Sequence, residues 1–201
     1  VNRGIEKSPP GNHSKKQQSR LPKVFDIAHI DSIVLMLCSS GIHRSVDNGI
    51  TWCKISNGLP DAYYNDGFTV QTIDSTKFLA WFSLPMIPDQ EIYISHDKGV
   101  TWESKIVKMI TGYKINDIAT VNGIVFILAI DDNLNYMVIR SNDYGNTWKS
   151  FSSGLPTSII APNYYESSYS TLSITKDSLW ISGNMDTVLV RPLNDDFTSD
   201  D

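Results

Sequence analysis

The chain has 201 residues, of which 41% are hydrophobic and 19% are charged, and its formal net charge is −5. This composition is that of a globular protein with enough apolar residues to form a core. The negative charge, without any Lys/Arg cluster among aromatic residues, argues against nucleic-acid binding, and no apolar run approaches the roughly 20 residues that span a bilayer.

The first complete unit along the chain is predicted to hold four short strands, at residues 24–30, 33–38, 42–45 and 51–56. Asp31-Ser32 separates its first two strands, and equivalent turns return at residues 74–75, 122–123 and 176–178. Continuous apolar runs, such as residues 124–128, are typical of strands that are buried between neighbouring layers. Since long helical periodicity is absent from the sequence, we predict an all-β protein.

An eight-residue pattern, S-x-D-x-G-x-T-W, follows the third predicted strand of each complete unit. Its copies begin at Ser45, Ser95 and Ser141, which are 50 and 46 residues apart (95 − 45 and 141 − 95). A repeat of this length in a strand-rich chain is typical of a β-propeller. The fixed positions are Ser45, Asp47, Gly49, Thr51 and Trp52; Ser95, Asp97, Gly99, Thr101 and Trp102; and Ser141, Asp143, Gly145, Thr147 and Trp148.

Each fixed residue of the pattern has a use in a hairpin turn. The glycine tolerates the positive φ that a tight turn requires, and the aspartate carboxylate accepts hydrogen bonds from backbone N–H groups in the turn. The tryptophan supplies a large apolar surface that closes the hairpin onto its neighbour. The pattern therefore predicts a structural hairpin and needs no catalytic role.

Degenerate copies extend the repeat in both directions. Residues 4–8 align with residues 41–45, and Val190-Arg191 aligns with Ile139-Arg140, so that residues 192–199 are predicted to be a worn copy of the pattern. We therefore predict one propeller domain of about four blades, either a closed small ring or part of a larger one. Its predicted units are a partial blade at residues 1–22, blades at 23–60, 61–108 and 109–156, and an incomplete last blade at 157–201.

The three intact copies resemble the Asp-box, or bacterial-neuraminidase repeat, of sialidases, sortilin-type receptors, xyloglucan-active glycoside hydrolases and a photosystem II assembly factor. The resemblance implies four-stranded antiparallel blades in which each box joins the third and fourth strands on the outer rim, away from the ligand face. It is also the basis for expecting a secreted, periplasmic or cell-surface protein.

The resemblance does not imply sialidase activity for this chain, because in sialidases that activity depends on three arginines that bind the substrate carboxylate. Arg44, Arg140 and Arg191 are assigned here to one repeat position on the third strand, which favours a structural role. The family also uses an Arg-Ile-Pro-like motif, and Arg191-Pro192 lacks the intervening isoleucine. We therefore do not expect a sialidase.

A carboxylate pair is the candidate catalytic feature. Asp26 and Asp117 each begin an Asp-Ile-Ala sequence on the first strand of a blade, which in propellers lines the central channel. Two carboxylates across a cleft can hydrolyse a glycosidic bond; alternatively, each bonds backbone near the start of its strand. No nucleotide-binding fingerprint or metal-ligand spacing occurs, so neither a cofactor nor a metal is expected.

Aromatic residues gather in segments predicted to lie on the face opposite the boxes. Tyrosine rings beside carboxylates and amides suit sugar stacking and also suit protein hot spots, whereas packing over the blade tops is the structural alternative. The long loop at residues 85–90 is expected to add a lip to this face. The predicted ligand-binding residues are Tyr63, Tyr64, Asp66, Tyr113, Tyr164, Tyr165 and Glu166.

The sequence thus predicts a non-catalytic propeller that binds a carbohydrate or a protein partner through its Tyr-bearing face. The alternatives are a glycoside hydrolase that uses Asp26 and Asp117, and a scaffold or assembly factor. An open ring would expose strand edges and favour self-association. Cys38 and Cys53 are expected as free, packed thiols, because alternate strands lie roughly 9–10 Å apart, beyond disulfide reach.

Overall fold

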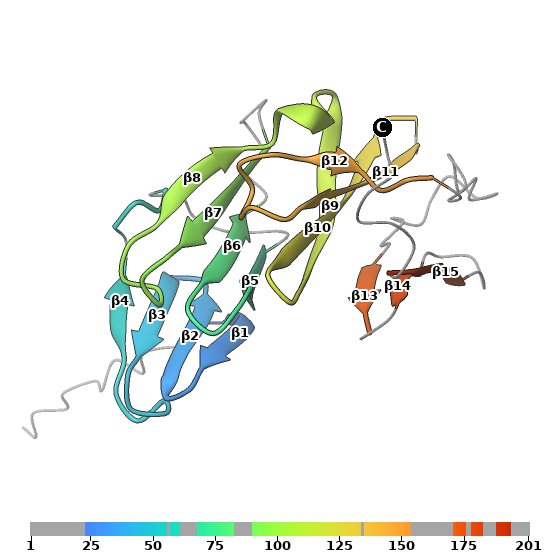
Figure 1. Cartoon of the computed structure of the whole chain (residues 1–201). Coiled ribbons are helices and arrows are strands. Elements are labelled where there is room, and N and C mark those ends of the chain that lie inside the picture. Colours follow the sequence, from blue (N-terminus) through green and yellow to red (C-terminus); the bar gives the residue numbers. More distant parts are fainter. Residues whose placement is uncertain are drawn as a thin grey trace, which may run out of the picture.

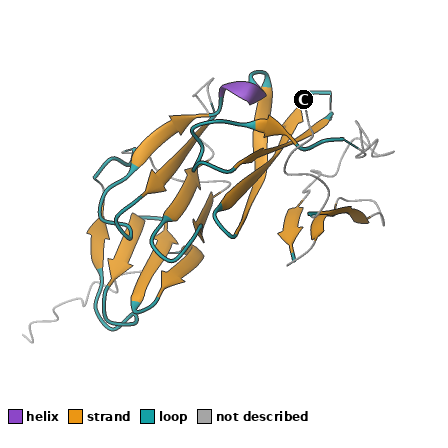
Figure 2. Cartoon of the chain, viewed as in Figure 1, coloured by secondary structure: helices purple, strands orange, loops and turns teal. Residues whose placement is uncertain are grey.

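The computed structural model describes residues 23–55, 57–60, 68–82, 90–133, 135–153, 171–175, 178–182 and 188–193. Within these ranges the chain forms three four-stranded sheets and one three-stranded sheet, all antiparallel, and inside each sheet every strand after the first pairs with the strand before it in the sequence. We call the sheets blades 1 to 4. Figure 1 shows them following one another along an arc, and Figure 2 shows that nearly all of the regular structure is strand.

The blades contain fifteen strands in the described ranges. Blade 1 holds β1 (Val24–Ile30), β2 (Ile33–Cys38), β3 (Gly41–Ser45) and β4 (Cys53–Ile55). Blade 2 holds β5 (Phe68–Thr72), β6 (Phe78–Phe82), β7 (Glu91–Ser95) and β8 (Glu103–Ile106). Blade 3 follows the short 3-10 helix η1 (Lys108–Ile110) and holds β9 (Tyr113–Val121), β10 (Ile124–Asp131), β11 (Tyr136–Ser141) and β12 (Lys149–Ser150). Blade 4 holds β13 (Thr171–Ile174), β14 (Ser178–Ser182) and β15 (Val188–Pro192).

The predicted strands of the first blade are confirmed, except that the third begins one residue earlier, at Gly41, and the fourth begins later than predicted. Strand β4 begins at Cys53 and not at Thr51, because Thr51 directs both its N–H and its hydroxyl to the Asp47 carboxylate. Thr51 therefore belongs to the turn and not to the strand ladder. No helix in the described ranges is long and apolar enough to cross a membrane.

The hydrophobic core consists of three clusters, one at each junction between consecutive blades. Leu35 and Phe78 pack between blades 1 and 2, Leu79 and Ile127 between blades 2 and 3, and Phe126 and Leu179 between blades 3 and 4. Strand β6 is buried along its whole length because it has a blade on both faces. This explains the continuous apolar runs in the sequence, since a strand that is covered on both sides has no polar face.

The three intact copies of the pattern, box 1 (residues 45–52), box 2 (95–102) and box 3 (141–148), share one hydrogen-bond network. In each box the serine hydroxyl donates to the aspartate Oδ1 at 2.7–2.8 Å and accepts the glycine N–H at 2.7–2.8 Å. The threonine donates its N–H to Oδ1 at 2.8–2.9 Å and its hydroxyl to Oδ2 at 2.6 Å. One carboxylate thus holds both ends of the turn.

The turn inside each box places two consecutive residues at positive φ. The glycines have φ of 83° to 87°, and the residues before them, Asn48, Lys98 and Tyr144, have φ of 56° to 60°. This is the type I′ geometry of tight hairpins. Asn adopts it readily, whereas Lys98 and Tyr144 are unfavourable there and are held by contacts with the preceding blade. The Lys98 carbonyl accepts the Arg44 Nε–H at 2.8 Å, and the Lys77 Nζ lies 4.4 Å from the Tyr144 ring centroid.

The strand register of blade 4 corrects the repeat alignment at its C-terminal end. Arg44 pairs with Leu35 on the second strand of blade 1, and Arg140 pairs with Phe126 at the same position of blade 3. In blade 4 this position is Trp180, and its partner is Val190. Arg191 therefore occupies the position of the box serine, one residue later than its sequence alignment with Arg140 places it. The predicted worn box is out of register by the same amount, because Leu193, which is buried between blades 3 and 4, takes the place of the box aspartate.

Candidate functional site

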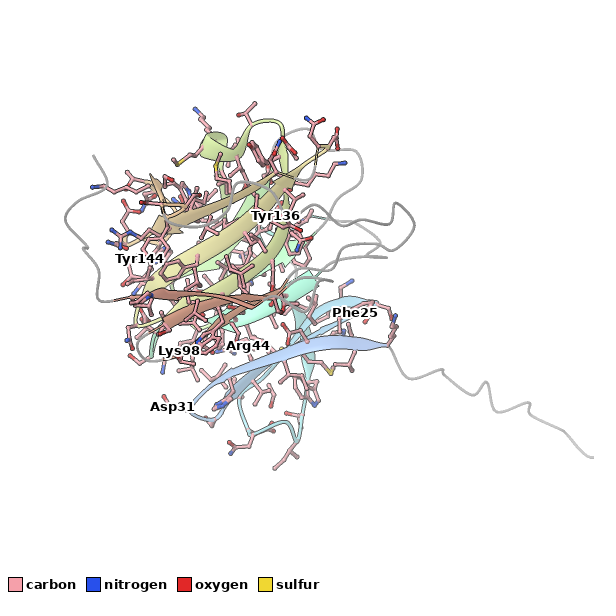
Figure 3. The ribbon with its side chains drawn as sticks, turned by 90° about the vertical axis from the view of Figure 1, so that its right-hand side faces the viewer. Phe25, Asp31, Arg44, Lys98, Tyr136 and Tyr144 are labelled. Carbon is pink, nitrogen blue, oxygen red and sulfur yellow. The ribbon has the colours of Figure 1, made fainter. Side chains whose placement is uncertain are left out.

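The molecule has two distinct faces that are set by the direction of the strands. The boxes share one face with the turns between first and second strands, because the Asn48 N–H donates to the Ser32 carbonyl and the Lys98 N–H to the Thr76 carbonyl. Figure 3 shows Asp31, Lys98 and Tyr144 toward this side and Phe25 and Tyr136 toward the other. We call the two sides the box face and the loop face.

Tyr113 begins β9 and lies on the loop face, opposite the turn at the far end of that strand. Its Cα faces Asp131, next to the pair of Ile130 and Tyr136, so two tyrosines begin the strands on either side of β10 at this end of blade 3. Tyr113 is half-buried against the cluster between blades 2 and 3. The other predicted ligand-binding residues, Tyr63, Tyr64, Asp66, Tyr164, Tyr165 and Glu166, lie outside the described residues, as does most of the 85–90 loop.

Sequence reasoning missed two aromatic residues of the loop face, Phe25 and Tyr136. Both stand at or next to the first residue of a strand that starts on this face. The available signal was positional, since the first and third strands of the described blades start on the same side as Tyr113. Lys23 adds a cation, with its Nζ 5.0 Å from the centroid of the Phe25 ring.

Asp26 and Asp117 connect the innermost strands of consecutive blades. The Asp26 Oδ2 accepts the Val70 N–H at 3.0 Å and the Thr69 hydroxyl at 2.8 Å, and the Asp117 Oδ2 accepts the Leu172 N–H at 2.7 Å. Each strand is irregular just before its aspartate, which the pairing registers show as shifts in β1 and β9. Such bulges re-aim side chains, and here the carboxylates are directed at the next blade.

Other side chains complete this series of links along the inner strands. The Thr72 hydroxyl donates to the His29 carbonyl and the Thr120 hydroxyl to the Thr72 carbonyl, at 2.9 and 2.8 Å. The Gln71 Nε2 donates to the Ile118 carbonyl at 2.6 Å. The first strands of neighbouring blades belong to different sheets and share no ladder, so these side chains satisfy backbone groups that would otherwise need water.

The environment of Asp117 differs from that of an ordinary surface carboxylate. Burial raises the pKa of Asp117, hydrogen bonds from the backbone N–H groups of Leu172 and Ile118 oppose the increase, and the charge of Asp26 adds to it. The geometry of both carboxylates matches the second possibility that the sequence left open, that of an acceptor for backbone N–H groups. The raised pKa of Asp117 is the one property that also suits a general acid.

The two arginines of the third strands of blades 1 and 3 have structural contacts, one across a blade junction and one within its own blade. Arg44 donates its Nε–H to the carbonyl of Lys98 in the next blade, and the buried Arg140 lies with its guanidinium carbon 5.2 Å from the Phe151 ring centroid. These two side chains are therefore not arranged as a carboxylate clamp. Within the described ranges no three His, Cys, Asp or Glu side chains gather as metal ligands. Cys38 on β2 and Cys53 on β4 are free thiols as predicted, but only Cys38 is packed, because Cys53 lies on the exposed outer strand.

The box carboxylates give the fold a defined response to acid. Hydrogen bonds from the Thr51 hydroxyl and N–H, and then from Ser45, lower the pKa of Asp47 to about 2. The pKa values of Asp97 and Asp143 are also lowered, because hydrogen bonds from the box threonine and serine outweigh the effect of burial, which raises them. An aspartate in an unfolded chain has a pKa of about 3.9.

We therefore expect the free energy of unfolding to decrease as the pH falls from about 5 to about 2. In this range the unfolded chain binds protons that the native box carboxylates do not, so acid favours unfolding. Urea denaturation at a series of pH values measures the effect, and Asp47→Asn should make the dependence on pH shallower. Parallel curves for the wild type and Asp47→Asn would contradict a titrating role of box 1.

Comparison with known proteins identifies the fold but no family. No known family and no curated protein matches the sequence. Among solved structures, the GH74 enzyme of Niastella koreensis matches 84% of this chain with 17% identity and a TM-score of 0.52, over 22% of its own length. The GH74 xyloglucanase from Xanthomonas campestris matches 82% of this chain with 14% identity and a TM-score of 0.52, over 27% of its length.

A third match is the Trypanosoma rangeli sialidase in complex with a difluoro-nononic acid, with 15% identity and a TM-score of 0.50. It covers 86% of this chain and 35% of its own length. The chain is a β-propeller. It spans about a fifth to a third of the length of these three proteins, and at such identities the likeness concerns the fold alone.

Proposed function

We propose that this propeller is a non-catalytic module that binds a carbohydrate on its loop face. The observation that carries the proposal is the placement of Phe25, Tyr113 and Tyr136 at strand starts on this face, in a fold shared with carbohydrate-active propellers. Half-buried tyrosines offer a rigid apolar ring together with a polar hydroxyl, a combination that suits sugar rings. The sequence predicts the other tyrosines to lie on this face as well.

The charge of the chain favours a neutral glycan. The matched solved structures include a xyloglucanase and a sialidase with an acidic ligand, so the fold accommodates both kinds of saccharide. A net charge of −5 repels a polyanionic chain at long range. Of the arginines that a carboxylate clamp would need, Arg44 is bonded to the Lys98 carbonyl and Arg140 lies against the Phe151 ring. We therefore propose a neutral polysaccharide of the xyloglucan type as the ligand class.

Titration calorimetry with xyloglucan oligosaccharides tests this proposal, with sialylated oligosaccharides as the acidic comparison. We expect Tyr113→Ala, and the double variant Tyr64→Ala/Tyr165→Ala, each to weaken binding at least about tenfold, which is about 1.4 kcal/mol. The matched control is Tyr144→Ala, because Tyr144 packs against the same hydrophobic cluster as Tyr113 but lies on the box face. The control should bind as the wild type does.

Each possible result of this experiment has a defined meaning. Unchanged binding in all tyrosine variants would remove the loop face as the site. Absence of any saccharide binding, together with stable capture of one protein partner, would support the scaffold alternative and contradict the proposal. Circular dichroism of each variant separates a loss of binding from a loss of folding.

A glycoside hydrolase remains the second candidate because of one observation, the raised pKa of Asp117 near the charge of Asp26. A retaining or inverting hydrolase needs one protonated and one ionised carboxyl group. Release of reducing ends from xyloglucan by the wild type, abolished in Asp117→Asn, would establish this activity. We expect no release, because both carboxylates accept backbone N–H groups of the adjacent blade.

A further inference from the structure

The repeat makes it possible to compare the same position in every blade. On the second strand, Leu35, Leu79 and Phe126 occupy one position, which points at the next blade and is fully buried in blades 1 to 3. In blade 4 this position holds Trp180, which is 38% exposed. Its pairing partner Val190, at the position of Arg44 and Arg140, is 46% exposed. Blade 4 thus presents an apolar face with no blade on it among the described residues.

Blade 1 presents the complementary face at the other end of the arc. Val70, Ile118 and Leu172 occupy one position on the first strand, which points at the preceding blade and is buried in blades 2 to 4. In blade 1 this position holds Ile27, which is 57% exposed.

The box of blade 1 gives an independent indication of the same uncovered face. A Cβ at Gly99 would lie 2.8 Å from Leu35, and one at Gly145 would lie 3.1 Å from Ile92, in each case a residue of the preceding blade. At Gly49 it would meet only Trp52 of its own box. Accordingly, Trp52 is 37% exposed, whereas Trp102 at the same position of box 2 is 6% exposed.

These two faces complement each other by construction. In every junction of the described chain, the face of one blade that points at the next blade packs against the face of the next blade that points back. Trp180 and Val190 lie on the first kind of face in blade 4, and Ile27 and Trp52 lie on the second kind in blade 1. Hydrophobic clusters of the described ranges join each blade only to the next, and none joins blade 4 to blade 1. Figure 1 shows these two blades at opposite ends of the arc.

We propose that two copies of the chain associate head to tail, with blade 4 of each copy packed on blade 1 of the other. The contact is heterologous and is used twice, so a two-fold axis closes the assembly and covers both of these faces in each copy. Two arcs of four blades give a ring of eight, which lies within the range of known propellers. The partner that fits the Trp180 face is thus a second copy of this chain.

Light scattering of the full chain over a range of concentrations tests the proposal. The wild type should have the mass of a dimer, whereas Trp180→Glu and Ile27→Lys should each be monomers, because either change places a charge in both junctions. An equimolar mixture of the two variants should recover the dimer mass. In that mixed dimer one junction is wild type and the other joins two opposite introduced charges.

Val100→Glu is the matched control, since Val100 is an exposed apolar residue of box 2 in an internal blade, and this variant should remain a dimer. A monomeric wild type at all concentrations would overturn the proposal. A dimeric Ile27→Lys beside a monomeric Trp180→Glu would indicate association through like faces and would also overturn it. Failure of the mixture to recover the dimer, with both variants folded by circular dichroism, would do the same.

Discussion

Gly58→Ala is expected to destabilise the fold by about 2–5 kcal/mol. Gly58 has φ of +83°, where a Cβ costs about 1–2 kcal/mol. A Cβ at this position would also lie 1.9 Å from the carbonyl oxygen of Trp102 in the next blade, and overpacking of this kind costs about 1–3 kcal/mol more. Relief of the clash would break the hydrogen bond from the Trp102 N–H to the Asn57 carbonyl.

Gly112→Ala is the control that isolates the contact between blades. Gly112 has φ of +84°, but a Cβ there would meet nothing within 4 Å. The free energy of unfolding of this variant should therefore fall only by the cost of placing alanine at positive φ. Urea denaturation of both variants at neutral pH gives the comparison. Equal losses of stability would show that the approach of Gly58 to Trp102 does not matter for the junction.

Ser141→Ala is expected to lower the free energy of unfolding by about 1–3 kcal/mol, although it removes a single oxygen atom. Ser141 is buried, and its hydroxyl accepts the buried N–H of Gly145 at 2.7 Å while donating to the Asp143 Oδ1 at 2.8 Å. Without the hydroxyl, the Gly145 N–H is left without its acceptor in a position that water does not reach.

The same change in box 1 provides an internal comparison. The bond from the Gly49 N–H to the Ser45 hydroxyl is only partly buried, so water can replace the oxygen in Ser45→Ala, and the loss should be smaller than in Ser141→Ala. Thermal unfolding monitored by circular dichroism ranks the two variants. A larger loss in Ser45→Ala would mean that the exposure of the glycine N–H does not determine the effect.

Local chemistry made much of the fold predictable. The strands β1 and β2 were bounded correctly because turn residues and apolar runs mark them on both sides. Features that depend on a neighbouring blade were not predictable in this way. The positive φ of Lys98 and Tyr144 contradicts their intrinsic preferences, and contacts with the preceding blade compensate for it. The register of Arg191 was missed because its blade lacks the serine and aspartate that fix the alignment elsewhere.

The candidate site was less accessible to sequence reasoning for a similar reason. The sequence offered two roles for Asp26 and Asp117, and only the position of the next blade shows which groups their carboxylates meet. Tyr113 was identified from its place before a predicted strand, whereas Phe25 and Tyr136 were not, because each lies within an apolar strand sequence. Whether a residue lies on the loop face depends on the direction of its strand in the folded blade. The type of the residue alone does not show that direction.

The division of the core into three separate clusters has a consequence for the dynamics of the molecule. Since each blade packs only on its sequence neighbours within the described ranges, the energy is approximately a sum of nearest-neighbour terms, as in other repeat architectures. Cooperativity is then limited by the weakest junction, and an end blade can open while the others stay folded. In a monomeric variant such as Trp180→Glu, whose end blades are uncovered, amide hydrogen exchange should accordingly be fastest at the ends of the arc and slowest in β6 and β10, the strands that have a blade on both sides.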